Sequence, residues 1–136
     1  MTVTTQLGIA TLMVAGTVLI HLVGLALLLA LLRRHRRSKG RLPAALGNAM
    51  AIIGAAFGLF ALHTAEIWAW ALLYRFLNVL PDFEQALYFS TTTYVTIGYG
   101  DVVLSSGSRI LGAIEGANGS SCWAGPPRSS FRSSIA

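Results

Sequence analysis

The sequence predicts an all-α membrane protein, and three observations support this. Of 136 residues, 54% are hydrophobic and only 11% are charged, and the mean hydropathy is +0.65. This composition is too apolar for a typical soluble domain of this size. Two apolar runs, residues 7–32 and 44–77, each exceed the roughly 20 residues that cross the hydrocarbon core of a bilayer. A strongly basic segment separates them.

Residues 1–32 are predicted to form an N-terminal transmembrane helix. No Asp, Glu, Lys or Arg interrupts the run from Leu7 to Leu32. A cleaved signal peptide is the competing interpretation, but the run is too long and no basic residue precedes it. His21 lies in the middle of this run, where we expect a neutral, hydrogen-bonded side chain rather than a ligand or a proton relay.

Residues 33–42 are predicted to form a cytoplasmic loop. Six of the ten basic residues fall here: Arg33, Arg34, Arg36, Arg37, Lys39 and Arg41. By the positive-inside rule the loop faces the cytoplasm, which puts the N-terminus outside. A pI of about 10.2 is also typical of nucleic-acid-binding proteins. A basic loop between two spans needs no nucleic acid as partner, however, because anionic lipid headgroups already attract it.

Residues 43–77 are predicted to form a second, outer transmembrane helix. Pro43 suits the first turn of a helix. Small residues recur at spacings of three and four, which lets another helix approach closely: Gly47, Ala51, Gly54, Ala55 and Gly58. Aromatic residues and a cation cluster near the far end, as expected at the outer headgroup level: Trp68, Trp70, Tyr74 and Arg75.

His63 and Glu66 form a possible polar pair within the second span. They are three positions apart and therefore share one face of the helix, at a depth where an unpaired charge costs several kcal/mol. The pair could hold a metal or relay protons, but it supplies only two ligands. The structural alternative is a hydrogen bond to each other or to the short helix that follows.

Residues 78–104 are predicted to re-enter the membrane from outside. The chain turns at Pro81, and Asp82 and Glu84 put carboxylates at the start of a short helix over 86–93. That helix is too short to cross a bilayer, so the segment must enter and return, which requires shielding by protein or an aqueous cavity.

The sequence Thr96-Ile97-Gly98-Tyr99-Gly100-Asp101 follows this helix. Glycines at alternate positions permit backbone conformations that other residues resist, so consecutive carbonyl groups can all point one way. A ring of such carbonyls can replace water around a cation. The structural alternative is an ordinary turn, in which glycine supplies positive φ and Asp closes an Asx-turn.

This segment, with roughly 80–119 around it, resembles tetrameric potassium channels with a pore helix and selectivity filter. The resemblance implies that the carbonyls of residues 96–99 and the Thr96 hydroxyl bind K⁺. It assigns a supporting role to Thr93, which matches the threonine of the family upstream of the filter. Val95 is assigned a supporting role too, although many members have Thr at this position. Asp101 is assigned to the filter as well, on the outer side, where with Asp82 and Glu84 it would concentrate cations. The structural alternative for Asp101 is a hydrogen bond to a group behind the filter.

The resemblance further implies a potassium-selective channel subunit rather than an enzyme. It would be a homotetramer in the plasma membrane that conducts K⁺ passively, with K⁺ as permeant ion, no other metal, no cofactor and no small-molecule substrate. Two alternatives from other classes stay open. One is a non-conducting or decayed channel-like protein, and the other is a membrane protein that handles a metal through His63 and Glu66.

The family pattern requires an inner helix after the filter, and residues 105–119 are predicted to begin one. Twelve residues, 108–119, cover only about 18 Å at 1.5 Å each, which is short of a hydrocarbon core of about 30 Å. Residues 120–136, rich in serine and proline, are predicted to form an aberrant polar tail. The inner helix is therefore expected to be truncated, and Cys122 in the tail receives no redox or metal role.

A shift of reading frame near Gly119 would account for this break. If the serines use TCN codons, reading one base earlier from Ser120 gives an apolar series, with Leu at the Cys122–Trp123 junction and Gly next. The nucleotide sequence tests this hypothesis, because a stop or a polar series in that frame contradicts it.

Overall fold

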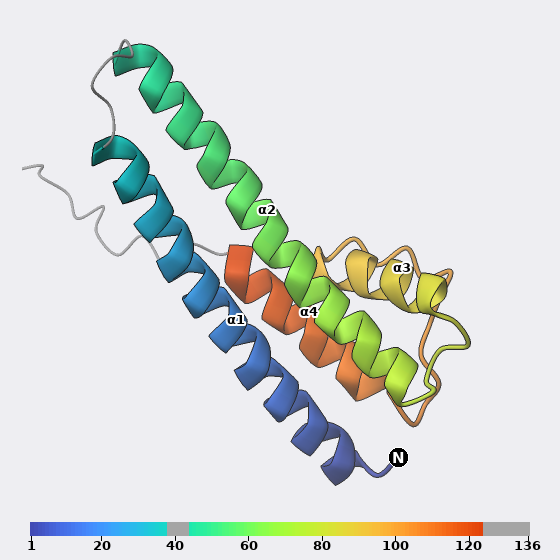
Figure 1. Ribbon diagram of the computed structural model, residues 1–136. Helices are drawn as coiled ribbons and strands as arrows, with labels where there is room; N and C mark the ends of the chain where they lie inside the picture. Colours follow the sequence, from blue (N-terminus) through green and yellow to red (C-terminus); the bar gives the residue numbers. More distant parts are fainter. Residues whose placement is uncertain (38–43, 124–136) are drawn as a thin grey trace, which may run out of the picture.

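The computed structural model describes residues 1–37 and 44–123, and within these residues the chain forms helices and no strand. The all-α prediction is confirmed. Figure 1 shows the four helices of the described residues, which are α1 (Val3–Arg37), α2 (Ala44–Phe76), α3 (Phe83–Tyr94) and α4 (Arg109–Trp123). The C-terminal end of α1 lies near the N-terminal end of α2, and α3 packs beside the C-terminal half of α2 (Figure 1).

Two helices are long and apolar enough to cross a membrane. They comprise Val3–Arg34, with a mean hydropathy of 2.5, and Leu46–Phe76, with 1.6. Their large side chains mostly point away from the bundle, as in Leu12 at 75% and Phe57 at 71% exposure. A soluble monomer rarely exposes so much apolar surface, so lipid or a neighbouring subunit is its natural cover.

Small residues bring α1 and α2 into close contact. A Cβ at Gly58 would come within 2.5 Å of the Leu28 side chain, and one at Gly24 within 2.0 Å of Leu62. The predicted small-residue face of the second span therefore does pack against a neighbour, and α1 is that neighbour.

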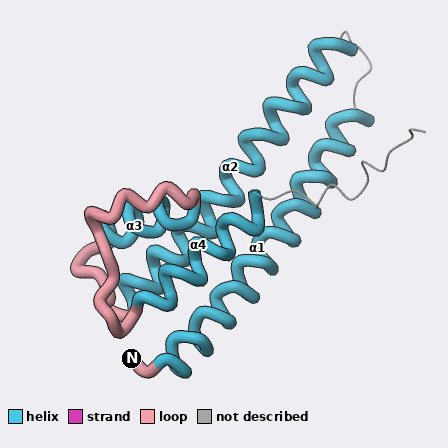
Figure 2. Tube along the Cα trace, turned by 180° about the vertical axis from the view of Figure 1, so that it is seen from behind, coloured by secondary structure: helices cyan, strands magenta, loops and turns pink. Residues whose placement is uncertain are grey.

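α3 and α4 complete the bundle at the end where the loops gather, which Figure 2 shows. Asp82 is the N-cap of α3, and its Oδ1 accepts a hydrogen bond from the Gln85 N–H at 2.8 Å. The predicted carboxylate start of the short helix is thus confirmed. α4 packs against both α1 and α3.

Two predicted boundaries differ from the structure. α1 continues through Arg37, because arginine is a good helix former and no breaker precedes Gly40, so residues 33–37 are helical rather than loop. Residues 38–42 of the predicted loop lie outside the described residues. α4 continues past Gly119 to Trp123, and the Ser120 and Ser121 hydroxyls within it donate hydrogen bonds of 2.9 and 2.8 Å back to the Ala117 carbonyl. The rest of the predicted tail, 124–136, also lies outside the described residues.

The prediction that the aromatic residues near the end of α2 lie at the headgroup level is wrong for two of them. Trp70 and Tyr74 are fully buried inside the bundle rather than placed at a headgroup surface. Trp68 is half-exposed and meets the edge of Phe83, with ring centroids 5.9 Å apart. Residue type alone could not distinguish these positions, since aromatic side chains suit both an interface and a buried contact between helices.

Candidate functional site

The segment predicted to bind ions begins directly after α3 and is hydrogen-bonded to the last turn of that helix. The Thr96 N–H donates to the Thr93 carbonyl at 3.0 Å. The N–H groups of Ile97 and Gly98 both donate to the Thr92 carbonyl, at 2.9 and 3.0 Å. These bonds satisfy carbonyl groups that a helix end leaves without partners, and they fix the start of the segment.

The same bonds determine where the carbonyl groups of this segment point. Across a trans peptide bond, the C=O of one residue is antiparallel to the N–H of the next, and no described peptide bond is cis. Because the N–H groups of residues 96–98 point back to α3, the carbonyls of Val95, Thr96 and Ile97 point away from it. Consecutive carbonyls therefore share one direction, unlike those of a strand.

Alternate residues of the segment have positive φ. The values are +61° at Thr96, +52° at Gly98 and +80° at Gly100, whereas Ile97 and Tyr99 between them keep negative φ. A Cβ at either glycine would meet no atom within 4 Å, so conformation rather than space requires glycine there. Positive φ at the β-branched Thr96 is a backbone outlier of the kind that clusters at functional sites.

Asp101 lies at the end of the segment and contacts the short helix. The Tyr88 hydroxyl donates a hydrogen bond of 2.7 Å to Asp101 Oδ2, which matches the predicted bond from Asp101 to a group behind the segment. This bond holds the pKa of the Asp101 carboxyl below its ordinary value. The carboxylate therefore stays ionised at the rim of the loop.

Thr93 and Val95 are both half-buried beneath the segment. Thr93 contributes its carbonyl to the bond with Thr96, and its side chain lies next to Gly116 of α4. Val95 borders a pocket between α2 and α3. Ile97 and Tyr99 are 55% and 70% exposed, so the described residues leave most of each side chain uncovered.

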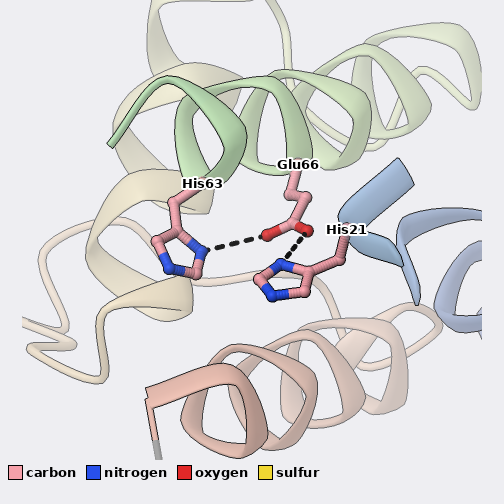
Figure 3. Close-up of side chains that lie close together, drawn as sticks. All are labelled: His21, His63 and Glu66. Carbon is pink, nitrogen blue, oxygen red and sulfur yellow. Dashed lines mark hydrogen bonds and ion pairs between the residues drawn. The ribbon is translucent and has the colours of Figure 1, made fainter. Parts of the chain in front are cut away.

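The His63–Glu66 pair is present and gains a third member from α1. His63 Nδ1 lies 3.1 Å from Glu66 Oε2, and His21 Nδ1 lies 2.9 Å from Oε1, as Figure 3 shows. The Tyr94 hydroxyl, in the last turn of α3, donates to Glu66 Oε2 at 2.5 Å. The expected hydrogen bond of His21 is therefore present, and its acceptor side chain is a carboxylate 45 residues away. Sequence spacing could not reveal this contact.

A second buried polar network, which the sequence did not reveal, surrounds Glu115. The Tyr74 hydroxyl donates to Glu115 Oε2 at 2.7 Å, and Ser90 Oγ bonds to Glu115 Oε1 and, at 2.9 Å, to the Ile67 carbonyl. Glu115 is fully buried, and the network joins α2, α3 and α4. One signal was available, because a lone carboxylate within a predicted membrane helix is costly unless it has partners.

A short helix packed beside a membrane-length helix and followed by a loop with aligned carbonyls is typical of a pore-loop membrane protein. Residues 60–126 match the sequence model of a family described as "Ion channel". This match places residues 60–126 in an ion channel family of the pore-loop type. No match was found among curated proteins, nor among solved structures. The matched region contains half of α2, then α3 and α4, and excludes α1.

Proposed function

We propose that the chain is one subunit of a potassium-selective channel, with residues 96–101 as its selectivity filter. The match of residues 60–126 to the ion channel family supports the general activity, passive ion conduction in a membrane. Selectivity for K⁺ is our inference from the filter sequence. A potassium filter replaces the hydration shell of the ion with several backbone carbonyls, and this sequence can supply them.

The parallel carbonyl groups of Thr96 and Ile97 carry the proposal. Their direction follows from hydrogen bonds to the last turn of α3, and the positive φ of Gly98 and Gly100 allows the same orientation to continue toward Tyr99. An ordinary turn reverses the chain over a single pair of residues, whereas here the alternation extends over five residues, 96–100. The Thr96 hydroxyl would complete the ligand set at the inner end.

Four copies of the chain would form one pore. A single segment offers ligands on one side only, so a closed ring requires association around an axis. Ile97 and Tyr99, exposed in one chain, would then be covered at the pore or against a neighbour. The N-terminus would lie outside and the basic residues at the end of α1 inside, with the plasma membrane as the expected location.

Ion flux into liposomes tests the proposal. Purified chain is reconstituted, and K⁺ and Na⁺ uptake are measured with and without Ba²⁺. We expect K⁺ flux that exceeds Na⁺ flux and that Ba²⁺ blocks. Because α4 has only 15 residues, about 22 Å at 1.5 Å each, we expect this flux to be weak.

A variant chain distinguishes two causes of weak or absent flux, a wrongly assigned filter and a short inner helix. In this variant, residues 120–136 are replaced by the apolar series of the alternative reading frame. Recovery of K⁺-selective flux supports both the filter and the frame hypothesis. If neither chain conducts, or if Na⁺ passes as readily as K⁺, the proposal is wrong and a non-conducting channel-like protein is the better description.

A further inference from the structure

Three side chains that bind metals well meet beside the last turn of α3. His21 comes from α1, and His63 and Glu66 come from α2. Figure 3 shows both imidazole rings directed at the two oxygens of one carboxylate. Glu66 is fully buried, and the histidine side chains are 22% and 16% exposed. The cluster thus lies inside the bundle, where the protein fixes its geometry.

The donor set matches the preferences of zinc-like metals. Two imidazole nitrogens and one carboxylate oxygen form a three-ligand set that proteins use for Zn²⁺, with a fourth position left over. One ligand atom from each residue lies within 4.8 Å of the others. Tetrahedral bonds of about 2.0–2.1 Å put donors about 3.4 Å apart, so closing the site needs only a small movement of the rings.

We propose that His21, His63 and Glu66 bind a divalent transition metal of the Zn²⁺ class. This inference does not depend on ion conduction. Sequence alone offered only the two ligands of α2, too few for such a site. The third ligand is visible only after α1 packs beside α2, because His21 is 45 residues from Glu66.

Tyr94 can complete the coordination. Its hydroxyl is already 2.5 Å from Glu66 Oε2, so it lies within reach of a metal held by that oxygen. As a phenolate it would also balance charge, since a dication with one carboxylate and one phenolate is neutral. Neutrality matters here because a net charge is costly in a medium of low dielectric constant.

A pocket of about 750 Å³ gives a metal access to the cluster. Both histidine rings line it, together with Thr64 and Thr91, while most of its remaining wall is apolar. Water in this pocket could occupy the fourth position if Tyr94 does not.

Metal binding would join α1 to the residues behind the filter segment. α1 lies outside the region that matches the ion channel family, and Tyr94 comes two residues before Thr96. A bound metal would therefore link the position of α1 to the end of α3. The proposed site thus gives the additional helix a ligand-binding role.

Direct binding of Co²⁺ and Cu²⁺ to the full chain tests the proposal. The protein is purified without a histidine tag, and Co²⁺ uptake is followed by visible absorption. We expect one Co²⁺ per chain with the intense bands of a four-coordinate site, displaced by Zn²⁺. We expect His21→Ala and His63→Ala each to weaken binding by more than the roughly 10- to 100-fold that loss of an outer-shell partner costs.

His35→Ala is the matched control, because the sequence has three histidines and His35 is the one that does not belong to the proposed site. This variant should bind Co²⁺ like the native chain. Equal loss in His35→Ala, equal retention in His21→Ala, or no uptake by the native chain would overturn the proposal.

A measurement on a folded chain guards against variants that do not fold. The paramagnetic resonance spectrum of Cu²⁺ bound to the His35→Ala chain should show coupling to two imidazole nitrogens. Coupling to one nitrogen or to none contradicts the proposed site, whatever the variants do.

Discussion

The Tyr88 hydroxyl donates a hydrogen bond of 2.7 Å to Asp101, thirteen residues further along the chain. The bond joins the first half of α3 to the end of the proposed filter, residues 96–101. Together with the bonds from residues 96–98 to the last turn of α3, it holds the segment at both ends. The conformation of the proposed filter is therefore fixed by the short helix behind it.

The pH dependence of this bond can be predicted. Because the pKa of Asp101 is lowered in the folded protein, the contribution of the bond to stability is complete above the ordinary Asp pKa of about 3.9. It is lost only as the pH falls through the lowered value. We expect no change at Asp101 between pH 7 and pH 5, measured by ¹³C NMR titration of its carboxyl group.

Tyr88→Phe should raise the Asp101 pKa toward the ordinary value, because the donor is removed. Tyr74→Phe is the control, since the Tyr74 hydroxyl bonds to Glu115 instead. An unchanged titration in Tyr88→Phe would show that another group sets this pKa.

Gly98→Ala should abolish most ion flux without disturbing the helices. Its φ of +52° costs a non-glycine residue about 1–3 kcal/mol, although a Cβ would meet no atom within 4 Å. Two quantities are measured for each variant: K⁺ flux in liposomes and thermal unfolding in detergent. Gly8→Ala in α1 is the control, because its surroundings are equally open and its φ is not positive. Full flux in Gly98→Ala would mean that this backbone conformation is not needed for conduction.

Gly119→Ala should destabilise the protein. A Cβ there would lie 2.1 Å from the Tyr94 carbonyl oxygen, so α4 must move away from the end of α3. Overpacking of this kind typically costs about 1–3 kcal/mol, which thermal unfolding in detergent can measure.

Gly116→Ala, in the same helix, gives a matched comparison. Its Cβ would meet the Thr93 carbonyl at 3.6 Å, an ordinary contact, and alanine favours a helix by up to about 1 kcal/mol over glycine. We therefore expect Gly116→Ala to be neutral or stabilising. Equal destabilisation by both variants would contradict the close approach of α4 at Gly119.

Tyr74→Phe should destabilise the bundle by about 1–3 kcal/mol, the usual cost of leaving a buried polar group without its partner. The group affected is the Glu115 carboxylate, which is fully buried. A double-mutant cycle with Glu115→Gln, followed by thermal unfolding, isolates the bond between the two side chains. Strictly additive effects would show that the bond contributes nothing.

Several features of this protein could be predicted from short stretches of sequence. The spans follow from the length of the apolar runs, and the start of α3 follows from Asp82, because the capping bond joins residues three apart. The glycines at 98 and 100 indicated an unusual backbone, and both have positive φ. The role of these residues in ion binding stays a prediction, as does the frame hypothesis for the tail. Each structural feature here depends on neighbours within a few residues.

Tertiary structure alone decided which distant side chains meet. The position of His21 in α1 did not indicate that its side chain would reach Glu66 of α2. Likewise, the position of Tyr74 in α2 did not indicate that its hydroxyl would point inward to Glu115 rather than outward to lipid. A lone polar residue in an apolar helix indicates only that its side chain needs a partner, since an unpaired polar group is costly in the membrane. Which partner it finds depends on how the helices pack, and the close approaches at Gly24, Gly58 and Gly119 fix that packing.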